Sequence, residues 1–196
     1  MTDTGADERI HLVVLFGGES AEHDVSCTTA AHVLAAADPD KYRITPIGIS
    51  TDGQWAIADS ARAALAGGTD AVPERLDPTG SAVSPTPVLD AAAASPGTTV
   101  VMPLLHGPMG EDGTVQGLLE LANVPYVGAG VMASALAMDK AMAKQVLAAN
   151  GIPQAAHRAF AEHEIEPGLP QRLVDELGLP LFVKPANMGS SVGVSR

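Results

Sequence analysis

The stretch Ile10-His-Leu-Val-Val-Leu-Phe-Gly-Gly-Glu-Ser-Ala-Glu-His-Asp-Val-Ser26 sets the fold class of this 196-residue chain. Its first seven residues are almost all apolar, which is typical of a strand buried on both faces of a parallel sheet. Two glycines then turn the chain, and residues 21–37 predict a helix that ends at Asp38-Pro39. Residues 42–50 predict a second strand, in which Pro46 indicates an edge or a bulge. This βαβ order predicts an α/β domain.

Further strands and helices are predicted on both sides of one irregular region, residues 67–87, which is rich in Gly, Pro, Thr and Ser. Asp139 is expected to cap a helix, and we place a domain boundary there, between residues 1–139 and 140–196. The remaining strands are expected at Trp55–Ala58, 99–105, 125–128, 157–161, 181–184 and 192–195. The remaining helices are expected at 60–66, 114–122, Val131–Met138, Lys140–Ala149 and 170–177.

The composition limits the partners and the compartment. The chain is 46% hydrophobic but only 3% aromatic, so its core must be built from aliphatic residues and methionine. A formal net charge of −12 argues against nucleic acid or an anionic membrane surface as a partner. A single cysteine, Cys27, excludes an internal disulfide and fits a reducing cytosol. The first eight residues do not resemble a signal peptide, and no apolar run approaches membrane-spanning length, so we expect a cytoplasmic protein.

The segment 17–26 is the first candidate site, because ligands of open α/β sheets bind at the carboxyl ends of strands. The backbone amides of Gly17 and Gly18 are predicted to bind an anion, and Glu22 and Asp24 a cation, which would suit a zwitterion. The alternative is an ordinary helix N-terminus whose acidic residues favour the helix dipole. A nicotinamide site is rejected because the Gly-x-Gly-x-x-Gly motif is missing here.

The second candidate site is His106-Gly-Pro-Met-Gly-Glu-Asp-Gly113. It follows a predicted buried strand directly and places turn-forming residues around one histidine, which favours a binding loop. A purely structural role is the alternative for His106. Asp112 is expected to cap the following helix, and Cys27 is expected to pack on its own helix because it has no neighbouring base pattern.

The third candidate site is Lys184-Pro-Ala-Asn-Met-Gly-Ser-Ser-Val-Gly193. Its small residues leave backbone amides and hydroxyls that can converge on a phosphate, as phosphate-binding nests do. It is not a Walker A loop, because the lysine precedes the glycines. A plain Gly/Ser hairpin is the alternative.

Together with Pro125-Tyr-Val-Gly-Ala-Gly-Val-Met-Ala-Ser-Ala-Leu-Ala-Met-Asp-Lys140, these three segments resemble the D-alanine–D-alanine ligase family of the ATP-grasp superfamily. The resemblance covers the chain except for residues 67–87, which look like a variable insertion. It implies a Rossmann-like, parallel-sheet (pre-ATP-grasp) substrate domain, followed by the beginning of an ATP-grasp central domain.

The resemblance also implies a role for each matching residue. Glu22 would hold the ammonium of the first D-alanine and bond to Ser190, and both are the implied catalytic residues. Val25 would line the pocket of this substrate, and His106 would lie beside its carboxylate. The residues implied to bind ATP are Lys140, Lys184, Gly189, Ser190 and Ser191.

In the implied reaction, ATP phosphorylates the carboxylate of one D-alanine, and the amine of a second D-alanine attacks the resulting acyl phosphate. The product would serve peptidoglycan precursor synthesis. Magnesium, or manganese in its place, would offset the charge on the transferred phosphoryl group. The metal ligands and the lid loop are expected beyond Arg196, so we expect the N-terminal part of a longer, homodimeric ligase that does not turn over alone. Alternatives are a ligase using D-lactate or D-serine second, and a non-catalytic D-alanine-binding module.

Overall fold

The structure, a computed structural model, describes residues 7–196. The chain forms two compact units that divide between Ser134 and Ala135. The boundary that we predict between residues 139 and 140 stays a prediction. Among the described residues, no helix is long and apolar enough to cross a membrane.

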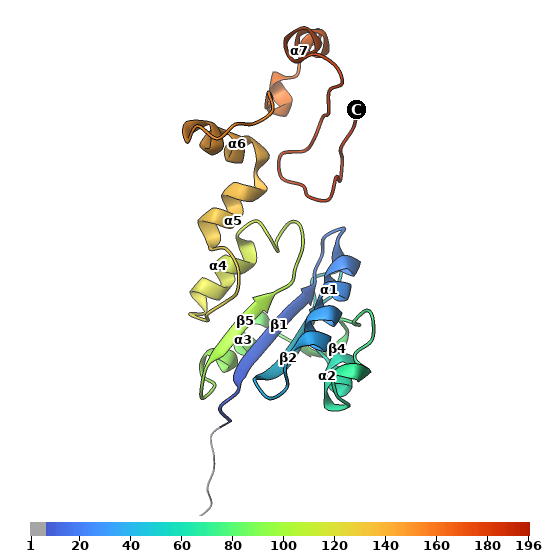
Figure 1. Cartoon of the computed structure of the whole chain (residues 1–196), viewed down its shortest axis with the longest axis vertical. Coiled ribbons are helices and arrows are strands. Elements are labelled where there is room, and N and C mark those ends of the chain that lie inside the picture. Colours follow the sequence, from blue (N-terminus) through green and yellow to red (C-terminus); the bar gives the residue numbers. More distant parts are fainter. Residues whose placement is uncertain (1–6) are drawn as a thin grey trace, which may run out of the picture. The chain divides into compact units, whose positions relative to one another are not determined.

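A five-stranded mixed sheet in the order β4-β3-β2-β1-β5 lies at the centre of the first unit. β1 (Ile10–Gly17) runs parallel to β2 (Tyr42–Ile49) and to β5 (Thr99–Pro103). Figure 1 shows β1 between these two strands. β3 (Trp55–Ala58) and β4 (Gly80–Val83) add two antiparallel strands beside β2. The α/β fold class is thus confirmed, with a parallel part of three strands.

Seven α-helices and two 3₁₀ helices complete the described part of the chain. In the first unit they are α1 (His23–Ala36), α2 (Asp59–Ala66), η1 (Thr69–Ala71), α3 (Pro85–Ala93) and α4 (Thr114–Leu121). α5 (Val131–Met138) contains the division between the units. The second unit has α6 (Lys140–Ala149), η2 (Glu162–Glu164) and α7 (Leu169–Leu177).

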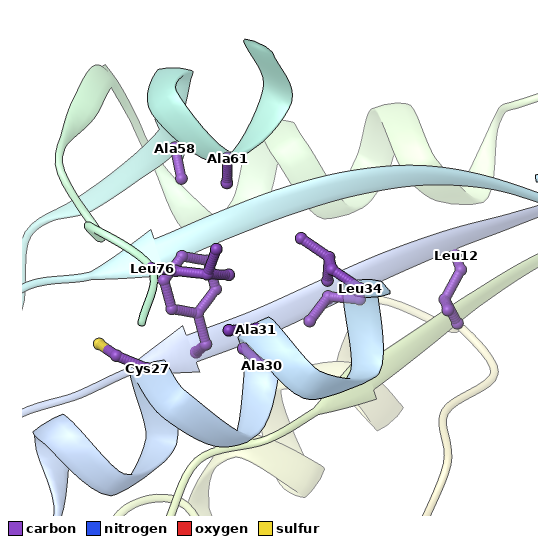
Figure 2. Packing of buried hydrophobic residues seen from close by; sticks show 10 residues of the cluster. Leu12, Cys27, Ala30, Ala31, Leu34, Ala58, Ala61 and Leu76 are labelled. Atoms are coloured by element: carbon purple, nitrogen blue, oxygen red, sulfur yellow. The ribbon is translucent and has the colours of Figure 1, made fainter. Parts of the chain in front are cut away.

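The side chains of β1 alternate between two separate cores, one on each face of the sheet. Leu12, Val14 and Phe16 pack in one core with residues of α1. The inner face of α1 is formed by small residues and Leu34, as Figure 2 shows. Val13 and Leu15 belong to the opposite core, together with residues of α3 and α4. The continuous apolar run of β1 therefore reflects burial on both faces, as predicted.

The irregular region that we expected at residues 67–87 is the main error in the sequence-based prediction. It contains η1, the edge strand β4 and the first turn of α3, which starts at Pro85. β4 consists of Gly80-Ser-Ala-Val83 and is mostly exposed, so it lacks the apolar alternation by which a strand is recognised. Its pairing with β3, rather than its side chains, makes it a strand.

Four expected short strands are also corrected. Residues 125–128 form only a bridge between Val101 and Tyr126, and residues 181–184 and 192–195 only a bridge between Val183 and Ser195. Residues 157–161 are not a strand. Residues 125–128 lie beside β5 but pair with it only at Val101. The bridge between Val183 and Ser195 has no further extended neighbour among the described residues, and a regular sheet needs one.

Pro46 is not at a sheet edge, because β2 lies between β1 and β3. It is paired with Val14 of β1, whereas the ladder with β3 starts only at Ile47. The missing amide hydrogen of the proline is therefore tolerated at a point where the β3 ladder has not yet begun.

We predict that Leu34→Ala lowers the free energy of unfolding of the first unit by about 2–5 kcal/mol, because it leaves a cavity beside β1. Urea unfolding followed by the fluorescence of Trp55, the only tryptophan, reports on this unit alone. The control is Leu121→Ala, whose side chain is 90% exposed and should change stability by less than about 0.5 kcal/mol. Equal losses in both variants would contradict the proposed core.

Candidate functional site

Two loops of the first unit meet where β1 and β5 end. One is the turn 17–22 between β1 and α1, and the other is the loop 106–113 between β5 and α4. Because β1 and β5 are parallel neighbours, their carboxyl ends lie at the same edge of the sheet. The hydroxyl of Ser20 donates to the carbonyl oxygen of His106 at 2.7 Å and accepts the amide of Glu22 at 3.1 Å.

The turn after β1 requires glycine. Gly17 has φ +89°, and a Cβ atom there would lie 2.2 Å from the carbonyl oxygen of Ile49. The amide of Gly17 donates to Ser26 Oγ at 2.8 Å, and the amide of Gly18 donates to the Ile49 carbonyl at 2.8 Å. The prediction that these two amides bind an anion is therefore wrong, because both already donate within the protein.

Ser26 links the turn to the strand end beside it. Its hydroxyl accepts the Gly17 amide and donates to the carbonyl oxygen of Leu104 at 2.6 Å. Ser26 is completely buried on the inner side of α1. A polar residue at such a position needs a hydrogen-bond partner, and this is the signal by which its role could have been found in the sequence.

The carboxylate of Glu22 packs against the second loop. A Cβ atom on Gly107 would lie 3.0 Å from Glu22 Oε2 and 3.3 Å from Ser20 Cβ. Gly107 is buried and has φ +72°. Glycine thus allows both the left-handed backbone and the close approach of the Glu22 carboxylate.

The next residues of α1 differ in their exposure and in their partners. Asp24 pairs with Arg75 at 2.5 Å on the protein surface, so the structure does not support its predicted pairing with Glu22 around a cation. Val25 is 53% exposed and presents an apolar surface one turn into the helix. Cys27 is completely buried, as predicted, and this burial raises the pKa of its thiol.

The ring of His106 contacts α1. Its Nε2 lies 3.4 Å from Thr29 Oγ1, and the Thr29 hydroxyl donates to the carbonyl oxygen of Val25 at 2.9 Å. Since the hydroxyl proton is used on Val25, the Thr29 oxygen has lone pairs that can accept a hydrogen bond from this ring nitrogen.

Acidic side chains fix the conformation of the histidine loop. Glu111 accepts the Gly107 amide at 2.7 Å, and Asp112 accepts the amides of Met109 and Thr114 at 2.8 and 3.0 Å. Desolvation alone would raise the pKa of Asp112, but these hydrogen bonds outweigh it and hold that pKa below its usual value. Asp112 thus accepts the first amide of α4, but the N-cap position itself is occupied by Gly113, so the predicted cap is only partly matched.

In the second unit, Asp139 caps α6 as predicted, because its carboxylate accepts the amides of Ala141 and Met142 at 2.9 and 3.0 Å. The ammonium of Lys140 donates to the carbonyl oxygens of Ala186, at 3.2 Å, and Met188. Lys140 therefore lies directly against the loop that follows Lys184.

That loop closes on the bridge between Val183 and Ser195, whose two backbone hydrogen bonds measure 2.9 and 3.0 Å. Ser190 and Ser191 have left-handed φ values of 45° and 59°. Two consecutive non-glycine residues in this region are uncommon, and such backbone strain clusters at ligand-binding sites. Lys184 is exposed at the start of the loop.

The predicted site residues thus fall into two groups. Glu22, Val25 and His106 belong to the first unit, where they surround one sheet edge. Sequence reasoning assigned no role to Ser20, Ser26 and Thr29, whose hydroxyls hold this edge together. The group in the second unit comprises Lys140, Lys184, Gly189, Ser190 and Ser191.

Comparison with known proteins identifies relatives. The family description "D-ala D-ala ligase N-terminus" matches residues 11–129, and "D-ala D-ala ligase C-terminus" matches residues 146–196. The D-alanine–D-alanine ligase of Deinococcus radiodurans is 47% identical over 187 residues, which cover 94% of this chain and 52% of that protein. The chain spans about half the length of the curated relatives it matches.

Solved structures of such ligases share the fold. The D-alanine–D-alanine ligase of Coxiella burnetii aligns with a TM-score of 0.75 and 36% identity, over 96% of this chain and 54% of that one. The VanG D-Ala:D-Ser ligase of Enterococcus faecalis aligns with a TM-score of 0.72 and 32% identity, over 95% and 55% of the two chains.

We predict that Gly107→Ala destabilises the first unit more than Gly97→Ala. Both glycines have left-handed φ values, 72° and 85°, so alanine should cost about 1–2 kcal/mol from the backbone at either position. Only at Gly107 does the methyl group also meet Glu22 and Ser20; at Gly97 its nearest contact would be at 3.9 Å.

Unfolding followed by Trp55 fluorescence measures both losses. In a Glu22→Ala background, part of the additional loss caused by Gly107→Ala should disappear, because the carboxylate no longer crowds the methyl group. Additive effects of the two substitutions would show that the Glu22 carboxylate does not lie against Gly107.

Proposed function

The chain belongs to the D-alanine–D-alanine ligase family, and we propose that it binds the first D-alanine and the phosphates of ATP in a reaction that joins two D-alanine molecules. The product would serve peptidoglycan precursor synthesis. In this proposal the carboxylate of one D-alanine is phosphorylated, and the amine of a second D-alanine attacks the resulting acyl phosphate. Phosphorylation makes the carboxylate oxygen a good leaving group.

The observation that carries the proposal is the packing of the Glu22 carboxylate against the backbone that follows His106. D-Alanine is a zwitterion with a small apolar side chain. Glu22 would accept its ammonium in a charge-assisted hydrogen bond, and His106 would lie beside its carboxylate. Val25, which is exposed at the same end of α1, would contact the methyl group. A bond between Glu22 and Ser190 stays a prediction.

The second unit would hold the ATP phosphates. The chain carries a net charge of −12, so binding of an anion depends on locally placed cations. Lys140 lies against the loop 185–195, and Lys184 begins it. We propose that both ammonium groups bind phosphate oxygens, with Gly189, Ser190 and Ser191 covering them. The family also implies magnesium or manganese. Among the described residues, no group of three or more His, Cys, Asp or Glu side chains could hold a metal ion.

The family also bears on the cellular compartment and the oligomeric state of this protein. A single buried cysteine fits the reducing cytoplasm, where the precursors of peptidoglycan are made in the proposed role. We propose a cytoplasmic protein that forms a homodimer at the length of its relatives.

A ligase that uses D-serine as the second substrate is an alternative; the solved D-Ala:D-Ser ligase is 32% identical over the aligned region, compared with 36% for the D-alanine–D-alanine ligase of Coxiella burnetii. A non-catalytic D-alanine-binding module is a third function. Measured at the length of the relatives, ADP release separates these functions: release that requires D-alanine supports a ligase, whereas D-alanine binding without any release supports the module. Comparing D-alanine with D-serine as the second amine distinguishes the two ligases.

We predict that Glu22→Gln weakens D-alanine binding by about tenfold to a hundredfold in isothermal titration calorimetry, because it removes a charge-assisted hydrogen bond. Glu19→Gln is the matched control, since Glu19 is an exposed acidic residue in the same turn. Its affinity should stay within about twofold of the wild type. Equal losses in both variants, or no effect of Glu22→Gln, would refute the proposed ammonium site.

A further inference from the structure

We propose that Ser20 is the positioning residue of this site: its hydroxyl ties the turn 17–22 to the loop 106–113 and thereby sets the spacing between Glu22 and His106. The tie itself rests on the geometry of the first unit. Its consequence for D-alanine rests on the proposed function, so the two are tested by separate measurements.

One oxygen atom forms hydrogen bonds with the backbone of both residues that we propose to bind D-alanine, Glu22 and His106. Ser20 Oγ donates its proton to the His106 carbonyl oxygen at 2.7 Å and accepts the Glu22 amide at 3.1 Å. A serine hydroxyl has one proton to donate and two lone pairs. Its proton is therefore already used, and Ser20 acts through Glu22 and His106 rather than on a substrate.

The surrounding contacts make this tie more than a surface hydrogen bond. Ser20 is half-buried, and its Cβ and Oγ lie 3.3 and 3.4 Å from the position of a Cβ atom on Gly107. The turn and the loop are thus in direct contact at Ser20. A shift of either loop would move the Glu22 carboxylate away from Gly107, where it now lies 3.0 Å from the same position.

Other hydroxyl groups near the site hold different parts of it. Thr29 contacts the imidazole ring of His106 and orients the side chain. Ser26 fixes the ends of β1 and β5 through Gly17 and Leu104, before either loop begins. The hydroxyl of Ser20 bonds the backbone of both Glu22 and His106, whereas the hydroxyls of Ser26 and Thr29 bond other groups.

Ser20→Ala removes both hydrogen bonds, whereas Ser20→Thr keeps the hydroxyl. The matched control is Thr28→Ala, which removes a hydroxyl that donates to the Asp24 carbonyl at 3.1 Å in the first turns of α1. Native-state amide exchange by NMR tests the tie without any ligand. In Ser20→Ala we expect the amides of Glu22 and Glu111 to exchange about tenfold faster. The amide of Leu104, which donates to Leu15, should be unchanged.

Calorimetry then tests the consequence for the ligand. We expect Ser20→Ala to weaken D-alanine binding by about fivefold to tenfold, Ser20→Thr to restore most of the affinity, and Thr28→Ala to leave it unchanged. If Ser20 had only a structural role, Ser20→Ala would be less stable than the wild type, but Ser20→Thr would not recover the affinity for D-alanine.

Three results would overturn the inference. Unchanged amide exchange in Ser20→Ala would show that the hydroxyl does not tie the loops, whatever the ligand does. Faster exchange with unchanged D-alanine affinity would refute the positioning role. Failure of threonine to restore affinity would exclude the hydroxyl as the cause. If the wild type binds no D-alanine, the proposed function and its consequence for Ser20 fail together, whereas the exchange measurement still decides the tie.

Discussion

Strand β1 pairs with β2 along one edge and with β5 along the other, while its alternate side chains enter two separate cores. A strand enclosed on four sides can carry polar functional groups only where it ends. At that end a side chain on Gly17 would collide with the Ile49 carbonyl, so glycine turns the chain and Glu22 follows five residues later. β5 ends at the same edge and brings His106 there. The position of the candidate site is thus a consequence of the burial of β1.

The features that could be predicted from the sequence are those that depend on neighbouring residues. The burial of β1 follows from its apolar run. The hydrogen bonds that Asp112 and Asp139 accept at the starts of α4 and α6 follow from the short distance between carboxylate and amide in the chain. The features that could not be predicted join distant segments. Ser26 bonds to Leu104, 78 residues away, through a backbone carbonyl that every residue possesses. No sequence pattern states which carbonyl will be nearby.

The predicted anion binding by the amides of Gly17 and Gly18 failed because these amides bond to groups that are distant in the sequence. Glycines at the end of a strand commonly leave amides for an anion, and here the sequence satisfied that pattern. The amides are instead used by Ser26 and by the carbonyl of Ile49, which the packing of α1 and β2 brings within 2.8 Å. In the proposed function, a zwitterion in the first unit is therefore recognised by side chains, those of Glu22 and His106.

The second unit is stabilised differently. Within Ala135–Arg196, Leu169 is the one described hydrophobic residue that is buried, whereas the first unit has two cores. Local hydrogen bonds replace a core: the Asp139 cap, the Lys140 ammonium on two loop carbonyls and the bridge between Val183 and Ser195. Two short segments without a third strand are only marginally stable, which explains why this bridge does not extend into a regular ladder.

In the proposed function, the carboxyl edge shared by β1 and β5 binds a D-amino acid. The most direct measurement is a titration of the ¹⁵N-labelled chain with D-alanine and, separately, with L-alanine, followed by amide NMR spectra. We expect saturable shifts for D-alanine centred on Glu22, Gly107 and their neighbours, and much weaker effects for L-alanine. Shifts of equal size for both enantiomers, or shifts that leave the turn 17–22 and the loop 106–113 unaffected, would contradict it.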